Sequence, residues 1–245
     1  MKYKNWFLFL FNLGIRIYSS MPNYTIKNLD LSDKELTKLP DDIDKYTNLK
    51  TLNCINNQLT SLDNLSNGQQ AGYEDKPLGF PPNLEALYCN YNKITSLDNL
   101  PPNLEILKCY GNQLTSLDNL PPNLKELNCG SNNITSLDNL PPTLEKLDCD
   151  RNKITSLDNL PPTLKELHCY NNKLTSLDNL PLKLESLFCY NNKITSLDNL
   201  PTNLEKLYCY GNQLTSLDNL PPTLEKLSCS GNPLKYDFEP TLKKY

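Results

Sequence analysis

The nine cysteines are the most reactive side chains in this sequence, and all of them occupy the same place in a recurring segment. Thiols could serve as nucleophiles, metal ligands or disulfide partners. If the segments form strands that pair in register, neighbouring thiols lie about 4.8 Å apart and point the same way, which strains a disulfide and cannot close a tetrahedron around zinc. We therefore predict buried, reduced cysteines that act as small apolar residues, with no metal site and no cofactor. The column comprises Cys54, Cys89, Cys109, Cys129, Cys149, Cys169, Cys189, Cys209 and Cys229.

The single histidine, His168, adjoins Cys169 and raises the question of a nucleophilic pair. Adjacent residues of a strand point to opposite sides, so the imidazole and the thiol cannot meet. No other grouping of a nucleophile, a base and an orienting residue is apparent along the chain. We therefore assign no catalytic residue and expect that the protein is not an enzyme.

A second column is acidic, and each of its aspartates is followed by asparagine. Calcium binding is one interpretation, but carboxylates spaced singly along a repeat lack the converging oxygen ligands that calcium requires. The favoured alternative is that Asp and Asn bond their own backbone two residues on and hold a turn before the prolines. The column comprises Asp63, Asp98, Asp118, Asp138, Asp158, Asp178, Asp198 and Asp218.

These columns belong to a twenty-residue repeat that runs from Pro81 onward without insertion or deletion. The unit at 101–120 follows the pattern L-x-x-L-x-C-x-x-N-x-L-x-x-L and opens with two prolines. Leu107 and Cys109 are two apart, so on a short strand they point to one side while Lys108 points to the other. We predict strands centred on the cysteine and the residue before it, stacked in register as a parallel sheet.

The pattern resembles the leucine-rich-repeat family, whose signature is L-x-x-L-x-L-x-x-N/C-x-L, with cysteine in the third apolar slot. The likeness covers about residues 26 to 234. The repeat length and the prolines are similar to the short-repeat class of bacterial effectors, and the TSLDNLPP segment resembles repeat proteins of giant amoeba-infecting viruses. The resemblance implies a repeat solenoid, curved and right-handed, with a parallel β-sheet on the concave face and a mostly non-helical convex side.

The resemblance also implies that a column of asparagines forms an internal structural ladder. In that family each amide turns inward and satisfies backbone groups where the chain leaves the strand. A buried backbone group without a partner costs on the order of 1 to 3 kcal/mol, which explains the need for such a ladder. The column comprises Asn57, Asn92, Asn112, Asn132, Asn152, Asn172, Asn192, Asn212 and Asn232.

We predict ten repeat units with atypical ends that stop the stack. Residues 1–21 are an apolar segment, interpreted as signal-like, as a loose tail or as a misassigned start. The N-terminal capping repeat is 22–48, the leucine-rich repeats are 49–234, and the C-terminal cap is 235–245. The fifteen residues 66–80 interrupt the period and read as a surface loop, which is also a place where function could lie.

The positions before and after the cysteine vary between repeats and are expected to be exposed on the concave face. Three consecutive repeats place aromatic rings there, whereas the two repeats before them carry Asn128, Asp148 and Asp150. Aromatic residues supply much of the energy of protein interfaces. An open alternative is that recently duplicated repeats carry copies of one Cys-Tyr dipeptide. The predicted partner-binding residues are His168, Tyr170, Phe188, Tyr190, Tyr208 and Tyr210.

Lys and Arg number 24 against 28 Asp and Glu, so the net charge of -4 disfavours nucleic acid as a partner. The apolar N-terminal run is too short for a stable membrane span. We predict a non-enzymatic scaffold that binds a protein on its concave face, with a host protein as one candidate. So many free thiols favour a cytoplasmic location, which is the host-cell cytoplasm for a viral or effector protein.

Two alternatives remain open from the sequence. One is an effector-like module that recruits substrates, of the kind that some short-repeat relatives carry before a ubiquitin ligase, although we expect no catalytic domain after Leu234. The other is an extracellular protein that binds glycans or a cell surface through its tyrosines, which requires a working signal peptide and a secreted location.

Overall fold

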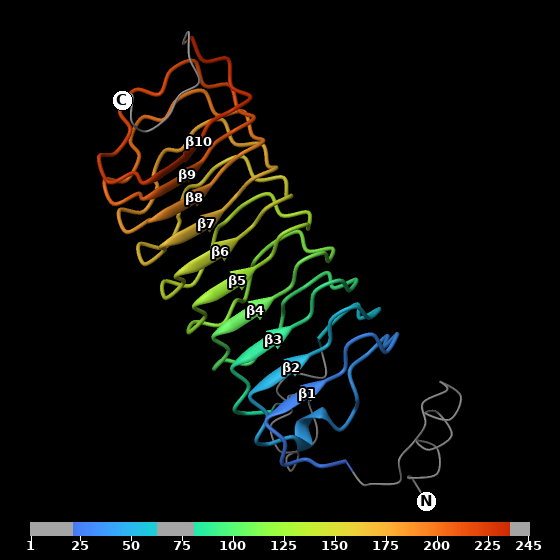
Figure 1. Cartoon of the computed structure of the whole chain (residues 1–245). Coiled ribbons are helices and arrows are strands. Elements are labelled where there is room, and N and C mark those ends of the chain that lie inside the picture. Colours follow the sequence, from blue (N-terminus) through green and yellow to red (C-terminus); the bar gives the residue numbers. More distant parts are fainter. Residues whose placement is uncertain (1–21, 63–80, 236–245) are drawn as a thin grey trace, which may run out of the picture.

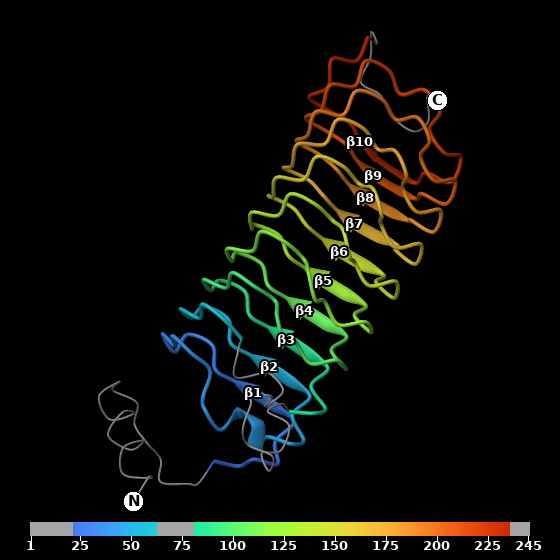
Figure 2. The same cartoon turned by 180° about the vertical axis from the view of Figure 1, so that it is seen from behind.

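The computed structural model describes residues 22–62 and 81–235 (Figure 1, and from behind in Figure 2). Ten parallel strands form one sheet in chain order, and the chain winds through about 9 turns with almost no helix. The short 3-10 helix η1 (Ile43–Lys45) lies between the first two strands in the sequence. The strands are β1 (Asn28–Asp30), β2 (Thr51–Asn53), β3 (Ala86–Tyr88), β4 (Ile106–Lys108), β5 (Glu126–Asn128), β6 (Lys146–Asp148), β7 (Glu166–His168), β8 (Ser186–Phe188), β9 (Lys206–Tyr208) and β10 (Lys226–Ser228).

Each strand is centred on a leucine, as in β4, where Leu107 is the middle residue. The prediction that the strands centre on the cysteine and the residue before it was wrong, because each strand from β2 to β10 ends one residue before the cysteine. The backbone turns there: the residue two after the cysteine has a left-handed φ, +68° at Gly111. The carbonyl of Cys109 then accepts hydrogen bonds from the side-chain amides of Asn112 and Asn132 instead of from a strand, at 3.0 and 3.1 Å.

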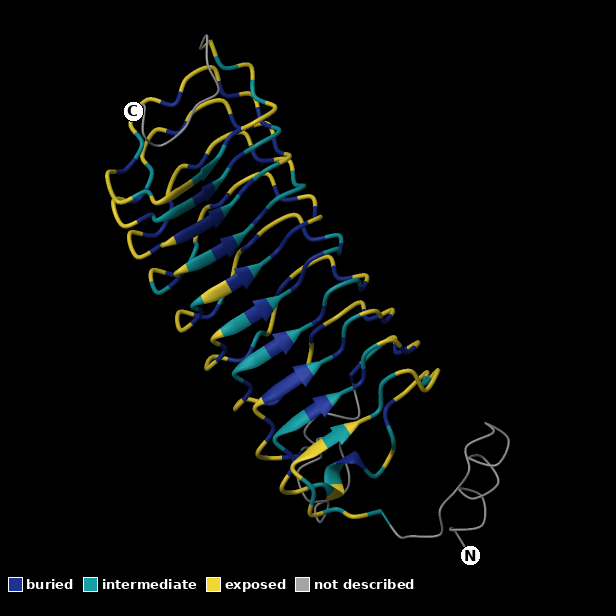
Figure 3. Ribbon diagram, in the orientation of Figure 1, coloured by how far each residue is buried: buried dark blue, intermediate teal, exposed yellow. Residues whose placement is uncertain are grey.

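The core is one continuous cluster of leucines, isoleucines and cysteines that runs the length of the stack. Figure 3 shows the buried centre of the inner strands. All nine cysteines are buried and none forms a disulfide, so the prediction of a buried, unbridged column is confirmed. Burial raises the pKa of the eight thiols from Cys54 to Cys209, to about 12 for Cys109, which keeps them protonated and poorly nucleophilic.

The stack is continuous across the point where the period is broken. Strand β2 pairs with β3 in the same register as the other neighbours, with Leu52 opposite Leu87. The amide of Asn92 donates to the carbonyl of Cys54 at 3.0 Å, the contact that the other repeats make. The insertion 66–80 itself lies outside the described residues, as do the N-terminal segment 1–21 and residues 236–245 of the predicted C-terminal cap. In the described ranges, no helix has the length and apolar character to cross a bilayer.

The aspartate column is held by side chains and not by the bond to its own backbone that we expected. Asp98 accepts a hydrogen bond from the Ser96 hydroxyl at 2.5 Å, and that hydroxyl accepts one from the Asp98 backbone at 3.1 Å. Asn119 of the next repeat donates to the same carboxylate at 2.7 Å. These bonds lower the pKa of Asp98. No group of three or more metal-ligating side chains occurs in the described ranges, and Asp63 falls outside them.

Candidate protein-binding face

The concave face is formed by the first and third residues of each strand and by the residue after each cysteine, whose side chains point away from the core. The structure brings all six predicted partner-binding residues together on this face, over β7, β8 and β9. They form two rows of rings that we call the aromatic patch. The first row is His168, Phe188 and Tyr208, and the second is Tyr170, Tyr190 and Tyr210.

In the first row, Phe188 lies between the other two rings. Its ring centroid is 4.2 Å from that of His168 and 4.5 Å from that of Tyr208, and the Phe188 and Tyr208 planes are within 5° of parallel. His168 also lies 2.9 Å from a carboxylate oxygen of Glu166 through Nε2. Because Cys169 points into the core while His168 lies on this face, the structure does not bring these two side chains together as a catalytic pair.

In the second row, Tyr190 stacks on Tyr170 at 4.2 Å and on Tyr210 at 4.3 Å, with both interplanar angles at 11°. The in-register strands impose this spacing, since neighbouring strands are about 4.8 Å apart. The rings therefore cover one another. All six residues of the patch are half-buried, whereas we expected them to be exposed. Burial raises the pKa of Tyr190. The patch offers ring edges and hydroxyl groups that are already ordered.

An acidic pair adjoins the aromatic patch: Asp148 is the last residue of β6 and Asp150 lies two residues after it. Both positions were expected to be exposed. Asp148 is partly accessible, but the Asp150 side chain is only 1% exposed. Its carboxylate fills the space beside Gly130: a Cβ on that glycine would lie 2.0 Å from an Asp150 oxygen. Tyr110 lies against the same space, 2.9 Å from that Cβ position. The signal that could have revealed this burial is the glycine, which occurs nowhere else in the column after the cysteines.

The two carboxylates of the pair have different hydrogen-bond partners. Asp148 accepts hydrogen bonds from the Asn128 amide at 3.1 Å and from the Asp150 backbone at 3.3 Å. Both oxygens of Asp150 are buried, with the Asp148 carboxyl and the Tyr170 side chain as hydrogen-bonding neighbours, and Arg151 Nε lies 3.4 Å from one of them. Burial, followed by the negative charge of Asp148, raises the pKa of Asp150 to about 6. Burial also raises the pKa of Asp148.

Removing the buried charge should stabilise the protein at neutral pH. The raised pKa means that the stability contributed by protonated Asp150 is present below its ordinary pKa and is lost as the pH rises through about 6. We expect Asp150→Asn to raise the unfolding temperature by roughly 2 to 4 °C for each kcal/mol of relieved desolvation at about pH 7.5, and by less at about pH 5. Calorimetry of the wild type and the variant at both pH values measures this difference. Equal shifts at the two values would contradict the assigned burial.

The side chains of the asparagine column lie beneath this face and bond backbone groups at the ends of the strands. Asn152 donates through its amide to the carbonyls of Cys129, Cys149 and Asp150, each at 3.1 Å. Its oxygen accepts from the Ile134 backbone N–H at 2.9 Å. Each ladder asparagine thus ties its own repeat to the preceding one, and the same set of contacts recurs from Asn92 to Asn232. These contacts hold the backbone at the end of each strand, directly beneath the residues of the concave face.

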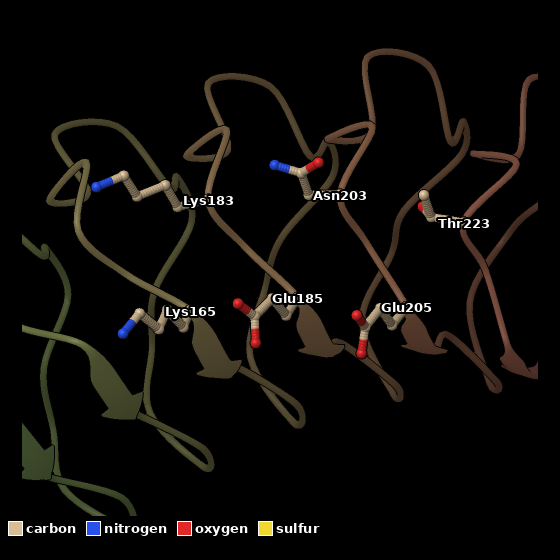
Figure 4. Close-up of a pocket in the computed structure, with 6 residues that line it drawn as sticks. All are labelled: Lys165, Lys183, Glu185, Asn203, Glu205 and Thr223. Atoms are coloured by element: carbon tan, nitrogen blue, oxygen red, sulfur yellow. The ribbon is translucent and has the colours of Figure 1, made fainter.

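A shallow groove of about 250 Å³ lies beside the strands, at the ends where they begin (Figure 4). Side chains of both charges line it, including Lys165, Glu185 and Glu205. Lys165 is bound to Glu145 of the preceding repeat at 2.8 Å, so its charge is already matched. We assign this groove no chemistry.

Comparisons with known proteins agree with this architecture. The family model described as leucine-rich repeats in two copies matches residues 82–122, 122–162, 162–202 and 182–222. No curated protein sequence matches the chain significantly.

Solved structures resemble the chain over most of its length. YopM from Yersinia enterocolitica is 32% identical with a TM-score of 0.73, covering 89% of this chain and 49% of that one. The functional domain of InlJ from Listeria monocytogenes, described as including a cysteine ladder, is 38% identical with a TM-score of 0.71, covering 86% and 45%. YopM from Yersinia pestis is 30% identical with a TM-score of 0.70, covering 84% and 60%. The chain thus spans about half the length of these proteins.

Proposed function

This chain belongs to the leucine-rich-repeat family, and on that premise we propose that it is a scaffold that binds a protein partner on its concave face. Leucine-rich repeats are typically non-enzymatic interaction modules. The observation that carries the proposal is the aromatic patch, six rings in two stacked rows on three neighbouring strands. Nine buried cysteines outside disulfides support a reducing compartment such as a host-cell cytoplasm as the location.

The geometry of the patch suits it to an interface. Binding costs side-chain entropy, typically about 0.5 to 1.5 kcal/mol for each side chain that is immobilised. Rings that already stack on one another at 4.2 to 4.5 Å have lost most of that freedom before the partner arrives. The tyrosine hydroxyls add polar groups at the edge of the large apolar area. The patch therefore offers a preorganised surface of the kind that contributes most to binding energy.

The test removes the two tyrosines of β9 and of its following turn. We expect Tyr208→Ser with Tyr210→Ser to weaken the complex with a purified partner by about 3 kcal/mol, more than a hundredfold in Kd. Stability should fall by only about 1 to 3 kcal/mol, because each of these rings has one stacked neighbour. Partners are first isolated from cell extract with the wild-type chain, and their affinities are then measured by titration calorimetry.

The matched control is Tyr88→Ser with Tyr91→Ser, which also removes two tyrosines but from β3 and the turn after it. This control should bind the partner as the wild type does. If both double variants bind like the wild type, the patch is a remnant of repeat duplication and the proposal is wrong.

A further inference from the structure

The carboxylates at the edge of the aromatic patch are not balanced by the cations around them. On the concave positions of β5 to β7, the acids Glu126, Asp148, Asp150 and Glu166 face the single lysine Lys146. That lysine is 3.6 Å from Glu166 and is therefore occupied. The excess negative charge therefore lies on the acidic pair, Asp148 and Asp150.

The other basic groups near the pair also have acidic partners of their own or make no hydrogen bond with it. His168 Nδ1 is 3.9 Å from Asp148, and its Nε2 is 2.9 Å from Glu166. Lys108 is hydrogen-bonded to Glu126. Arg151 lies 3.4 Å from Asp150 but makes no hydrogen bond with it, and its own side chain is 60% exposed. A carboxylate that is 1% exposed and has only another carboxyl and a tyrosine as hydrogen-bonding neighbours is costly when ionised, since buried charges are normally paired with an opposite charge. The site thus lacks a hydrogen-bonding cation.

The accessible member of the pair shows where such a cation would enter. Asp148 is 26% exposed, and Asp150 lies beside it and beneath the surface, between Gly130 and the second aromatic row. A cation bound to Asp148 would lie over both charges. It would also lie at the end of the two aromatic rows, where His168 and Tyr170 have no stacked ring on the β6 side. Guanidinium and ammonium groups bind favourably to carboxylates and to ring faces.

We propose that the Asp148–Asp150 pair is the receptor for one lysine or arginine side chain of the protein partner, whose neighbouring apolar residues lie on the aromatic patch. This proposal rests on the proposed function and specifies the partner's chemistry. The partner presents a basic residue next to large apolar ones, and the pair selects it by charge. A metal ion suits the site less well, because calcium takes about six to eight oxygen ligands and two carboxylates supply only a few of them.

The test is selection of random peptides displayed on phage against the immobilised full chain. Three forms of the chain are used in parallel: the wild type, Asp148→Asn with Asp150→Asn, and Tyr208→Ser with Tyr210→Ser. We expect the wild type to enrich peptides with lysine or arginine beside aromatic or aliphatic residues. The asparagine variant should enrich apolar peptides without the basic residue. Synthetic copies of the wild-type peptides should bind the asparagine variant about 10- to 100-fold more weakly.

The outcomes separate this proposal from the proposed function. Enrichment of the same peptides by the wild type and the asparagine variant overturns the basic-residue receptor and leaves the aromatic patch supported. Peptides that need the acidic pair but bind the tyrosine variant equally well overturn the patch and support the receptor. Failure to enrich any peptide contradicts both. A rise in the unfolding temperature of the wild type, but not of the asparagine variant, with Ca²⁺ alone would assign the pair to a metal and also overturn the receptor.

Discussion

Replacing Asn152 by alanine is expected to lower the free energy of unfolding by about 3 to 5 kcal/mol. The change leaves the Ile134 N–H buried without its acceptor and removes three further hydrogen bonds, those to the carbonyls of Cys129, Cys149 and Asp150. The missing side-chain volume adds a cavity term. Urea denaturation followed by circular dichroism measures the loss.

The control for this variant is Asn103→Ala. Asn103 is exposed and donates one hydrogen bond, to the Pro82 carbonyl at 3.1 Å. We expect a loss of about 0.5 to 1.5 kcal/mol, the ordinary net value of one hydrogen bond. Similar losses for the two variants would mean that water replaces the internal amide without cost, and would contradict a stabilising role for the asparagine column.

Truncation of a strand leucine in the middle of the stack is the second change with a large expected effect. Leu147 is 1% exposed, and it pairs in register with Leu127 and Leu167 of the adjacent strands. Leu147→Ala should cost about 3 to 5 kcal/mol, because rigid neighbours on both sides prevent the cavity from closing. The same denaturation experiment measures it.

The chain offers a matched leucine outside the core. Leu182 replaces the proline that several other units have at this position, and it is 77% exposed. Leu182→Ala should change the stability by less than about 0.5 kcal/mol. A large loss there, or a small one at Leu147, would contradict the assignment of core and surface.

The repeat pattern was sufficient to predict the fold, because each position of the unit has one role that recurs along the stack. Leucine spacing predicts the parallel strands, and the identical place of the cysteines predicts their burial. The strand centre was misplaced because an apolar residue after a strand is buried as deeply as one within it. Leu107 and Cys109 look alike in the pattern, and only the backbone hydrogen bonds of Cys109 separate them.

The composition of the candidate site was predictable, but its burial was not. The period places six aromatic residues together, whereas the degree to which rings cover one another depends on side-chain rotamers. The burial of Asp150 depends on the residue twenty positions earlier, since Gly130 leaves the space that the carboxylate fills. Such a dependence between repeats is invisible when each column is read by residue type alone.

The asparagine contacts also make the fold tolerant of a change in the number of repeats. Each ladder amide reaches back to the preceding repeat with the same bonds, as Asn112 does to Cys89 and Asn132 to Cys109. Every junction between regular units is therefore chemically equivalent, and a gain or loss of one whole unit creates no mismatched junction. A single recombination event within the gene could lengthen or shorten the recognition surface while the fold is preserved. Variation in copy number then changes the length of the concave face without the instability that most point mutations cause.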